Sequence, residues 1–280
     1  MDYKKYMNRL KDRYEAPYIQ IPNKLISELN DSLRKHELQR YTDYGFSFLV
    51  VNGFLYKYSH YLDYEESDYL LLSDIKRILK YNPNNQNINK ISKKGSGVLD
   101  YESFVEVTDD IPVSIEYVKE KNEKLELRVP IRLSEMDWVV SDEIKYNVLK
   151  SRKHEVYIPE YMIDYPAKKG TLNNYDNTTK ITYKEFEYFI LSDDMNLKDF
   201  LVYCFIKSTA TSSGEAHISY DRAQRGMGLS RMTFLKVVDK LEEMNIVSVK
   251  KGGNVHRFKK SPNILSIKPS FMKKVGIKRL

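Results

Sequence analysis

The sequence predicts an α+β fold made of two winged helix-turn-helix domains in tandem, mainly helical with small antiparallel β-wings. Three observations support this prediction. Residues 218–260 have the pattern of two helices and a basic hairpin, residues 45–129 follow a similar order, and a short Ile-Pro segment precedes each series. We expect an N-terminal winged-helix-like domain at 1–135, a connecting helix or linker at 136–155, and a C-terminal winged-helix domain with a basic tail at 156–280.

The first predicted elements are a polar helical arm at Met1–Ala16 and an alternating strand at Tyr18–Pro22. Apolar residues at three- and four-residue spacing then predict a helix at Gly45–Leu62. A shorter helix at Leu72–Tyr81 is expected to be capped by Ser73 and to end before the proline that follows it, because proline cannot continue a helix.

A third helix is predicted at Gln86–Lys94, with strands at Val98–Val107 and, after a charged loop, at Lys124–Val129. Its outward side chains suit DNA, because side-chain amides pair with adenine and lysine reaches guanine or phosphate. The candidate contacts in this half are Asn85, Gln86, Asn87, Lys90, Lys93 and Lys94. A polar surface loop is the alternative, because asparagine is a poor helix former.

A repeated segment supports a duplication, since Ile21–Ile26 resembles Ile158–Ile163. Each copy is followed, after a polar gap, by an aromatic-rich helix, then by a capped helix and a lysine-bearing helix. The identities are few, so chance similarity is the alternative. Between the copies, Trp138 is expected to fill the interface between the two domains, and residues 168–180 are expected to form a polar loop.

The C-terminal half carries the more complete helix-turn-helix pattern. Ser219 can cap a first helix and Ser230 a second, because a serine hydroxyl accepts hydrogen bonds from the free N–H groups of a first turn. Gly228 supplies the turn between the two helices. The second helix has an apolar stripe made of Phe234, Val237, Val238, Leu241 and Met244. Its outward residues would face the major groove of DNA.

A basic hairpin is predicted directly after that helix. A strand at Ile246–Val249 leads to a turn at Lys251–Asn254 and a returning strand at Val255–Lys259, and a further short strand at Asn263–Ile267 could close the sheet. Such a hairpin after a recognition-type helix is typical of a winged helix-turn-helix. The alternative is a solvated helical hairpin followed by an incidental β-ribbon.

Positive charge is concentrated in the C-terminal part of the chain. The formal net charge is +7, yet residues 196–280 hold 17 basic and 6 acidic residues, a net +11, whereas residues 1–195 carry −4. From Asn245 onward there is no acidic residue. Charge placed only for solubility would be interspersed, so this segregation favours a phosphate-binding face.

Enzymatic chemistry is not expected. The five histidines have no metal-ligand spacing, and no glycine-rich phosphate loop precedes a lysine and a serine or threonine. No His-x-His pair exists that could hold a metal beside a nicking tyrosine, which argues against a rolling-circle endonuclease. Neither a cofactor nor a metal is therefore predicted. The one cysteine, Cys204, lies on an apolar helical face and is expected to be core. The absence of a signal peptide or a membrane-length apolar run predicts a cytoplasmic, nucleoid-associated protein.

Three segments carry a resemblance to a family. Ser219–Ala223, Gly228–Thr233 and Leu241–Val247 look like the helix-turn-helix of plasmid and phage replication initiators built from two winged-helix domains. One departure is Gln224, where the pattern usually has a small apolar residue. The resemblance implies binding to repeated sites at an origin of replication, local opening of the DNA and recruitment of host replication proteins. It also implies a homodimer that regulates its own promoter.

Specific DNA contacts follow from the expected docking of the second helix. Arg231 and Lys236 would read base edges, while the other basic residues would fix the register on phosphates. The candidate contacts in this half are Ser219, Arg222, Arg225, Ser230, Arg231, Met232, Thr233, Lys236, Lys240, Lys250, Lys251, Arg257 and Lys259.

Two other functions remain open at this point. A transcriptional regulator (repressor) of a mobile element would use the same double-stranded DNA contacts without opening the duplex. An adaptor would bind protein through its N-terminal domain, an option that the negative charge of residues 1–195 favours.

Overall fold

The computed structural model describes residues 17–58, 71–110, 112–119, 126–132, 134, 155–162, 177–250 and 262–275. The predicted N-terminal arm, the connection with Trp138, most of the loop at 168–180 and the tip of the hairpin lie outside the described residues. No described helix is both long and apolar enough to cross a membrane.

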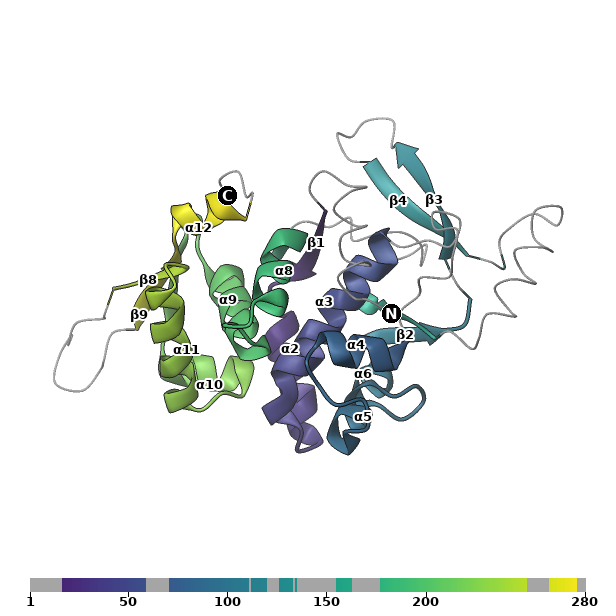
Figure 1. Cartoon of the computed structure of the whole chain (residues 1–280), viewed down its shortest axis with the longest axis horizontal. Coiled ribbons are helices and arrows are strands. Elements are labelled where there is room, and N and C mark those ends of the chain that lie inside the picture. Colours follow the sequence, from purple (N-terminus) through teal and green to yellow (C-terminus); the bar gives the residue numbers. More distant parts are fainter. Residues whose placement is uncertain are drawn as a thin grey trace. The chain divides into compact units, whose positions relative to one another are not determined.

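The chain forms two compact units whose limits differ from the predicted domain boundaries. Figure 1 shows the helices and small sheets of the described residues. Unit 1 comprises residues 1–19 and 48–176, and unit 2 comprises residues 20–47 and 177–280. The N-terminal segment 20–47 therefore belongs with the C-terminal half. The cause is packing between elements far apart in sequence, which local periodicity does not report. The described architecture is α+β, with helices and small antiparallel sheets.

Unit 1 consists of short helices and two strand pairs. Its helices are residues 48–58 of α3 (Thr42–Tyr58), α4 (Leu72–Ile78), α5 (Gln86–Ser92), α6 (Val98–Tyr101) and the 3-10 helix η4 (Glu160–Met162). β2 (Val105–Thr108) pairs antiparallel with β5 (Val156–Pro159). β3 (Pro112–Lys119) pairs antiparallel with β4 (Glu126–Arg132).

Two predictions for unit 1 are wrong in detail. The expected strand at Val98–Val107 begins as helix α6, because the tight turn at Gly97 directs the chain into a helical turn before β2. The expected charged loop contains strand β3, whose sequence alternates apolar and polar residues with the period of a strand. In addition, Ser73 lies inside α4, while Leu71 is its N-cap.

Packing against α3 explains the interior glycine of that helix. A Cβ on Gly53 would lie 2.6 Å from the hydroxyl oxygen of Tyr161, which donates a hydrogen bond of 3.1 Å to the Leu49 carbonyl. Burial raises the pKa of Tyr161, so this phenol stays protonated. The glycine therefore allows η4 to pack against the helix.

The two repeated segments continue differently after their strands. The first copy runs from β1 into the α-helix α2, whereas the second runs from β5 into the 3-10 helix η4, so the likeness of the two copies ends after the strand.

Unit 2 has a helical core with two sheets. The N-terminal segment supplies β1 (Tyr18–Pro22, of which Gln20–Pro22 belong to the unit), α2 (Leu25–Lys35) and η1 (Gln39–Tyr41). The remaining elements are β6 (Thr178–Thr182), α8 (Tyr183–Leu191), α9 (Leu197–Thr209), β7 (Glu215–Ile218), α10 (Tyr220–Met227), α11 (Arg231–Glu243), β8 (Val247–Lys250), β9 (Asn263–Ile267) and α12 (Pro269–Lys274). β1 and β6 form one two-stranded sheet.

An aromatic cluster fills the centre of unit 2. Phe200 of α9 meets Phe186 and Phe189 of α8 with ring centroids 5.6 Å apart, and Tyr203 meets Phe271 of α12 at 5.7 Å. Helix α9 is buried over most of its length, and Cys204 is buried on it as predicted. Burial raises the pKa of this thiol, which therefore stays protonated and packs as an apolar group.

The second sheet has the order β7-β9-β8, with β9 in the middle. Lys250 of β8 pairs with Ile264 of β9, so the described partner of β8 is the later strand and not the one predicted at Val255–Lys259. Residues 251–261 lie outside the described residues. Strand β7 has no counterpart in the prediction, because its four residues are too few for a clear alternation.

A buried carboxylate joins β6, α8 and α9. Glu185 is fully buried and accepts hydrogen bonds at Oε1 from the Tyr203 hydroxyl and from Lys207 Nζ, the latter at 2.6 Å. At Oε2 it accepts from the Thr182 N–H at 2.7 Å, while Lys207 Nζ also donates to the Lys180 carbonyl at 2.6 Å. Burial, followed by the negative charge of Glu185, raises the pKa of Tyr203. Every charge in this cluster is thus paired.

The turn before α11 is crowded by the N-terminal segment. Gly228 has φ +69°, and a Cβ there would clash with Asn30 Oδ1 and lie 3.0 Å from the Gln39 carbonyl oxygen. Gly214 also has a positive φ, +77°, but nothing lies within 4 Å of the position that a Cβ would take there. The two glycines share a backbone conformation and differ in their surroundings.

We expect Glu185→Gln to lower the free energy of unfolding by about 3–5 kcal/mol, because it leaves the buried Lys207 ammonium without its counter-charge. The measurement is urea unfolding followed by circular dichroism. Adding Lys207→Met should restore part of the loss, since an apolar side chain removes the unpaired charge. The exposed Glu243→Gln is the control, with an effect below about 0.5 kcal/mol. Equal effects of the two Glu→Gln changes would contradict the assigned role.

We expect Gly228→Ala to destabilise the protein more than Gly214→Ala. Both variants carry the cost of a left-handed alanine, about 1–2 kcal/mol, but only Gly228→Ala must also displace Asn30 and the backbone of Gln39. The comparison is made by thermal and urea unfolding of both variants. Equal losses of stability would show that segment 20–47 does not press on this turn.

Candidate nucleic-acid interface

Helix α11 is positioned as its sequence pattern predicts. The Ser230 hydroxyl accepts a hydrogen bond of 3.2 Å from the Thr233 N–H and so caps the helix. Its apolar stripe is buried at Phe234, Val237, Val238 and Leu241, while Met244 is half-buried. This stripe fixes the rotation of the helix about its axis, which decides the residues that face solvent.

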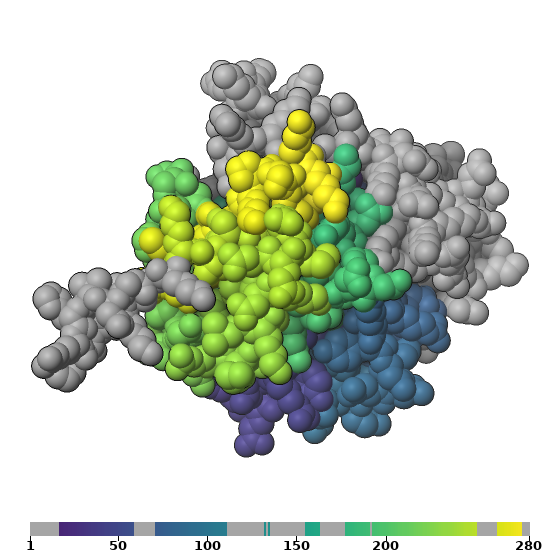
Figure 2. All heavy atoms as spheres, turned by 60° about the vertical axis from the view of Figure 1, so that its left-hand side comes forward, coloured from purple at the N-terminus to yellow at the C-terminus, as the bar shows by residue number. Residues whose placement is uncertain are grey.

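The exposed side of α11 is basic only in its first half, which also includes one large apolar side chain; Asp239, Glu242 and Glu243 are exposed in the second half. Ser230, Arg231, Met232 and Lys236 are exposed, whereas Thr233 and Leu235 are half-buried. The Met232 side chain is unusual for a surface, with 64% exposure. Figure 2 shows the yellow-green side chains of this part of the chain at the surface of the unit. Cationic donors and an apolar contact together are the groups that base edges in a major groove require.

An aromatic ring orients the guanidinium of Arg231. Its Cζ lies 4.4 Å from the ring centroid of Tyr220, which itself packs edge-on against Phe234 at 6.3 Å. A cation over a ring face is attracted by the ring quadrupole. Arg231 is therefore held near the start of α11 while its side chain stays exposed.

Helix α10 begins and ends as predicted. The Ser219 hydroxyl caps it by accepting from the Arg222 N–H at 3.2 Å, and left-handed Gly228 ends it. Ala223 and Met227 are buried, whereas Gln224 is exposed. The small apolar residue that meets the neighbouring helices is thus Ala223, and Gln224 does not disturb the packing.

Lys240 does not lie in position for a phosphate contact. Its Nζ forms an ion pair of 2.6 Å with Asp199 Oδ2, and Asp199 is 1% exposed. The same carboxylate oxygen accepts from the Asn196 N–H at the start of α9, at 2.9 Å. Lys240 therefore fastens α11 to the N-terminus of α9, where a carboxylate is favoured by the helix dipole. Helical periodicity could place Lys240 near the surface but not identify its partner.

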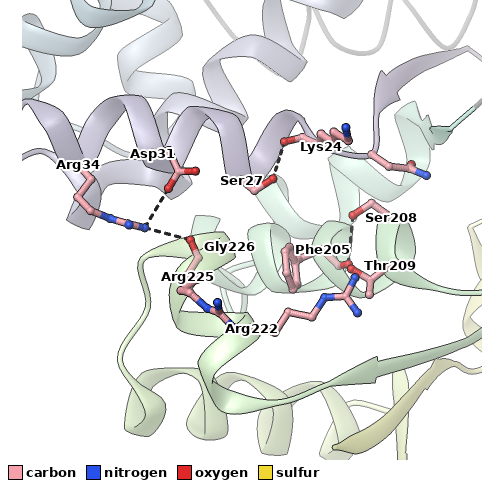
Figure 3. Close-up of a pocket in the computed structure, with 11 residues that line it drawn as sticks. Lys24, Ser27, Asp31, Arg34, Phe205, Ser208, Thr209, Arg222, Arg225 and Gly226 are labelled. Atoms are coloured by element: carbon pink, nitrogen blue, oxygen red, sulfur yellow. Dashed lines mark hydrogen bonds and ion pairs between the residues drawn. The ribbon is translucent and has the colours of Figure 1, made fainter.

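The basic residues of α10 face a different neighbour. Arg222 and Arg225 are both exposed, and both line a pocket whose opposite side is α2 (Figure 3). No residue of α11, β8 or β9 is among those that line it. Sequence reasoning missed this pocket, because five of its eleven lining residues come from the distant segment at 23–34.

The predicted contacts on the hairpin are only partly described. Lys250 is exposed and forms an ion pair of 3.3 Å with Glu215 of β7. Lys251, Arg257 and Lys259 lie outside the described residues. An exposed pair of this kind adds little stability, so Lys250 can exchange Glu215 for a phosphate at low cost.

In unit 1, the predicted helix at Gln86–Lys94 forms as α5 but ends at Ser92. Gln86 and Lys90 on the helix, and Lys93 and Lys94 after it, are exposed. Asn85 is engaged as the N-cap, with Oδ1 accepting from the N–H groups of Asn87 at 3.0 Å and Ile88 at 3.3 Å. Asn87 is half-buried. The side-chain oxygen of Asn85 is therefore used within the helix, so a base contact through that oxygen would break the cap.

One lysine beside α5 is internal. Lys76 of α4 is buried, and its Nζ donates to Asn89 Oδ1 and, at 3.3 Å, to the Pro83 carbonyl. Burial lowers the pKa of this ammonium. Lys76 fixes the turn between α4 and α5, so it contributes no surface charge to a DNA contact.

The units also differ in charge. Unit 2 holds 23 Lys and Arg against 14 Asp and Glu, a net +9, whereas unit 1 holds 23 against 25, a net −2.

Within the described ranges, no group of three His, Cys, Asp or Glu side chains could hold a metal ion. No known protein family, curated protein or solved structure matches the chain.

We expect Lys240→Gln to lower the free energy of unfolding by about 1–3 kcal/mol, because it leaves the buried Asp199 carboxylate without its cation. The same change should leave the salt dependence of any DNA affinity unaltered, since this lysine is engaged inside the fold. Chemical unfolding and DNA titrations at several salt concentrations measure both effects. Lys198→Gln, at an exposed lysine of α9, is the control. A weaker dependence of DNA affinity on salt concentration, with unchanged stability, would instead show that Lys240 contacts DNA.

Proposed function

We propose that the chain is a sequence-specific double-stranded DNA-binding protein in which unit 2 is a winged helix-turn-helix and α11 is its recognition helix. The observation that carries this proposal is the exposed face of Arg231, Met232 and Lys236 at the start of α11. The turn at Gly228 precedes that helix, and the β7-β9-β8 sheet accompanies it. The N-terminal residues of a recognition helix are those that reach base edges.

The surroundings of each side chain in unit 2 indicate which part of the DNA it would contact. Arg231 is oriented by Tyr220 and exposed, which suits a bidentate contact with guanine. Met232 would pack against a thymine methyl group, and Lys236 would reach a neighbouring base edge. Lys250, at the base of the hairpin, would meet a backbone phosphate. The net charge of +9 supports attraction of the unit to DNA.

Unit 1 is proposed as a second, diverged winged helix. The order α3, α4, α5 and β2 parallels the order α9, α10, α11 and β8 in unit 2, except that α6 precedes the strand in unit 1 and β7 lies between α9 and α10 in unit 2. Lys90, Lys93 and Lys94 remain exposed on and after α5 for phosphate contacts. The net charge of −2 and the engaged amide of Asn85 favour a second role for this unit, as a protein-binding adaptor.

The biological role that we propose is replication initiation on a plasmid, phage or other mobile element, with repeated origin sites as the target and host replication proteins as partners. A homodimeric form would serve promoter control. A transcriptional regulator is the second candidate, since it would use the same surface of α11. Capture of genomic DNA fragments by the purified chain separates the two. Several direct repeats beside an AT-rich tract support initiation, and one inverted repeat over a promoter supports regulation.

We expect Arg231→Gln to weaken binding to the selected duplex by about 1–3 kcal/mol and to relax the base preference at one position. The measurement is a titration of the selected duplex and of its single-base variants, after site selection from a random pool. Lys198→Gln removes one exposed positive charge outside α11 and serves as the control. The proposal fails if Arg231→Gln and Lys198→Gln leave affinity and base preference equally unchanged.

A further inference from the structure

A basic pocket lies in unit 2 on elements other than the proposed recognition helix. It has a volume of about 550 Å³ and is lined by residues of α2, α9 and α10, with the turn before α2 at its edge. Figure 3 shows the side chains of Arg222 and Arg225 rising from α10 on one side, and Lys24, Ser27 and Arg34 on the other. The proposed function assigns no task to this pocket.

The charge around the pocket is strongly unbalanced. Lys24, Arg34, Arg222 and Arg225 line it, and Asp31 is the single carboxylate among the lining residues. Asp31 pairs with Arg34 at 3.1 Å and so offsets one cation. Three positive side chains then remain around one cavity, an arrangement that an anionic ligand would relieve.

The two arginines of α10 retain donors for such a ligand. Arg222 Nη1 donates to the His217 carbonyl at 3.2 Å, and Arg225 Nε donates to the Asp221 carbonyl at 3.3 Å. A guanidinium carries five N–H donors in a fixed fork that matches phosphate oxygens. One backbone hydrogen bond each therefore orients the two groups and leaves most of their donors without a partner among the described residues.

The walls of the pocket are fixed by a hydrogen bond between α2 and α10 and by the close packing of α10 on α9. Asn30 Nδ2 donates to the Arg225 carbonyl at 2.7 Å, which holds α2 against the end of α10. A Cβ on Gly226 would lie 2.6 Å from the ring of Phe205, so α10 and α9 approach closely only because this residue is glycine. A site with fixed walls loses little conformational entropy when a ligand binds.

We infer that this pocket binds a phosphate group, held by the forks of Arg222 and Arg225 with Lys24 as a further cation. The hydroxyl groups of Ser27 and Ser208 already donate to the Lys24 carbonyl at 2.8 Å and to the Phe205 carbonyl at 3.1 Å. The lining hydroxyl that suits a phosphate oxygen as a donor is therefore that of Thr209. The phosphate comes either from the backbone of bound DNA or from a free phosphorylated compound. The first source rests on the proposed function, whereas phosphate recognition itself does not.

The first experiment uses inorganic phosphate and the full chain. The thermal midpoint is measured against phosphate concentration, with chloride at matched ionic strength as the reference, for the wild type, Arg222→Gln/Arg225→Gln and Lys35→Gln/Lys198→Gln. The last variant removes two exposed positive charges outside the pocket. We expect a saturable rise of the midpoint in the wild type and in the control, and its loss in the pocket variant. The same saturable rise in all three proteins overturns the inference.

The second experiment distinguishes the two sources of phosphate. DNA affinity is measured as a function of salt concentration for the same three proteins. If the pocket holds a backbone phosphate, its double variant lowers the slope of log K against log salt by about 0.9 for each lost contact. An unchanged slope, together with loss of the phosphate-dependent midpoint, assigns the pocket to a free phosphorylated compound. Failure of the wild type to bind DNA rejects the proposed function and leaves the first experiment decisive for the pocket.

The fold of the pocket variant is checked by its midpoint in chloride. The hydrogen bonds of Asn30 and Arg34 end on the backbone carbonyl of Arg225, so Arg225→Gln preserves them. If the double variant does not fold, Arg222→Lys/Arg225→Lys replaces it, because lysine keeps the charge and loses the fork. Its phosphate response should saturate at a higher concentration than that of the wild type, and an identical response overturns the inference.

Discussion

The buried carboxylate of Glu185 is the constraint on which unit 2 depends. A carboxylate is costly to bury unless charge and hydrogen bonds compensate it, and here Tyr203, Lys207 and the Thr182 N–H all donate to it. Because these donors come from α9 and from the end of β6, the cluster fixes α9 relative to β6 and α8. The ion pair of Lys240 and Asp199 in turn holds α11 against α9. These contacts hold α11 on α9, while the buried apolar stripe of α11 decides which of its residues face solvent.

Partners, rather than residue type, decide what each basic residue can do. Lys207, Lys240 and Lys76 each have a partner inside the fold, and burial lowers the pKa of Lys76. Arg231 and Lys236 are exposed, and the only contact described for either of them is the ring beneath Arg231. A surface charge of this kind remains available to a ligand, whereas an internal ion pair contributes to stability. The segregation of charge along the sequence therefore overstates the number of cations that can meet DNA.

Segment 20–47 changes the surroundings of the α10–α11 helix pair. Asn30 binds the last turn of α10, and its Oδ1 lies within clashing distance of the position that a Cβ on Gly228 would take. An ordinary turn glycine needs only a positive φ, but this one also needs the absence of a side chain. The same packing of α2 on α10 encloses the pocket lined by Arg222 and Arg225. The packing of α2 on α10 thus both restricts the residue at the turn and forms one side of the basic pocket.

The sequence by itself determined the local elements: β1, most of α3, the Ser219 and Ser230 caps, the turn at Gly228 and the apolar stripe of α11. These features depend on residues within one or two helical turns, so periodicity and capping preferences report them. Only the tertiary structure decided that residues 20–47 belong with the C-terminal half, that β9 lies between β7 and β8, that Lys240 is engaged by Asp199, and that Arg222 and Arg225 share a pocket. Each of these depends on a partner far away in sequence, selected by burial and by the need to pair charge, and no local pattern records that partner.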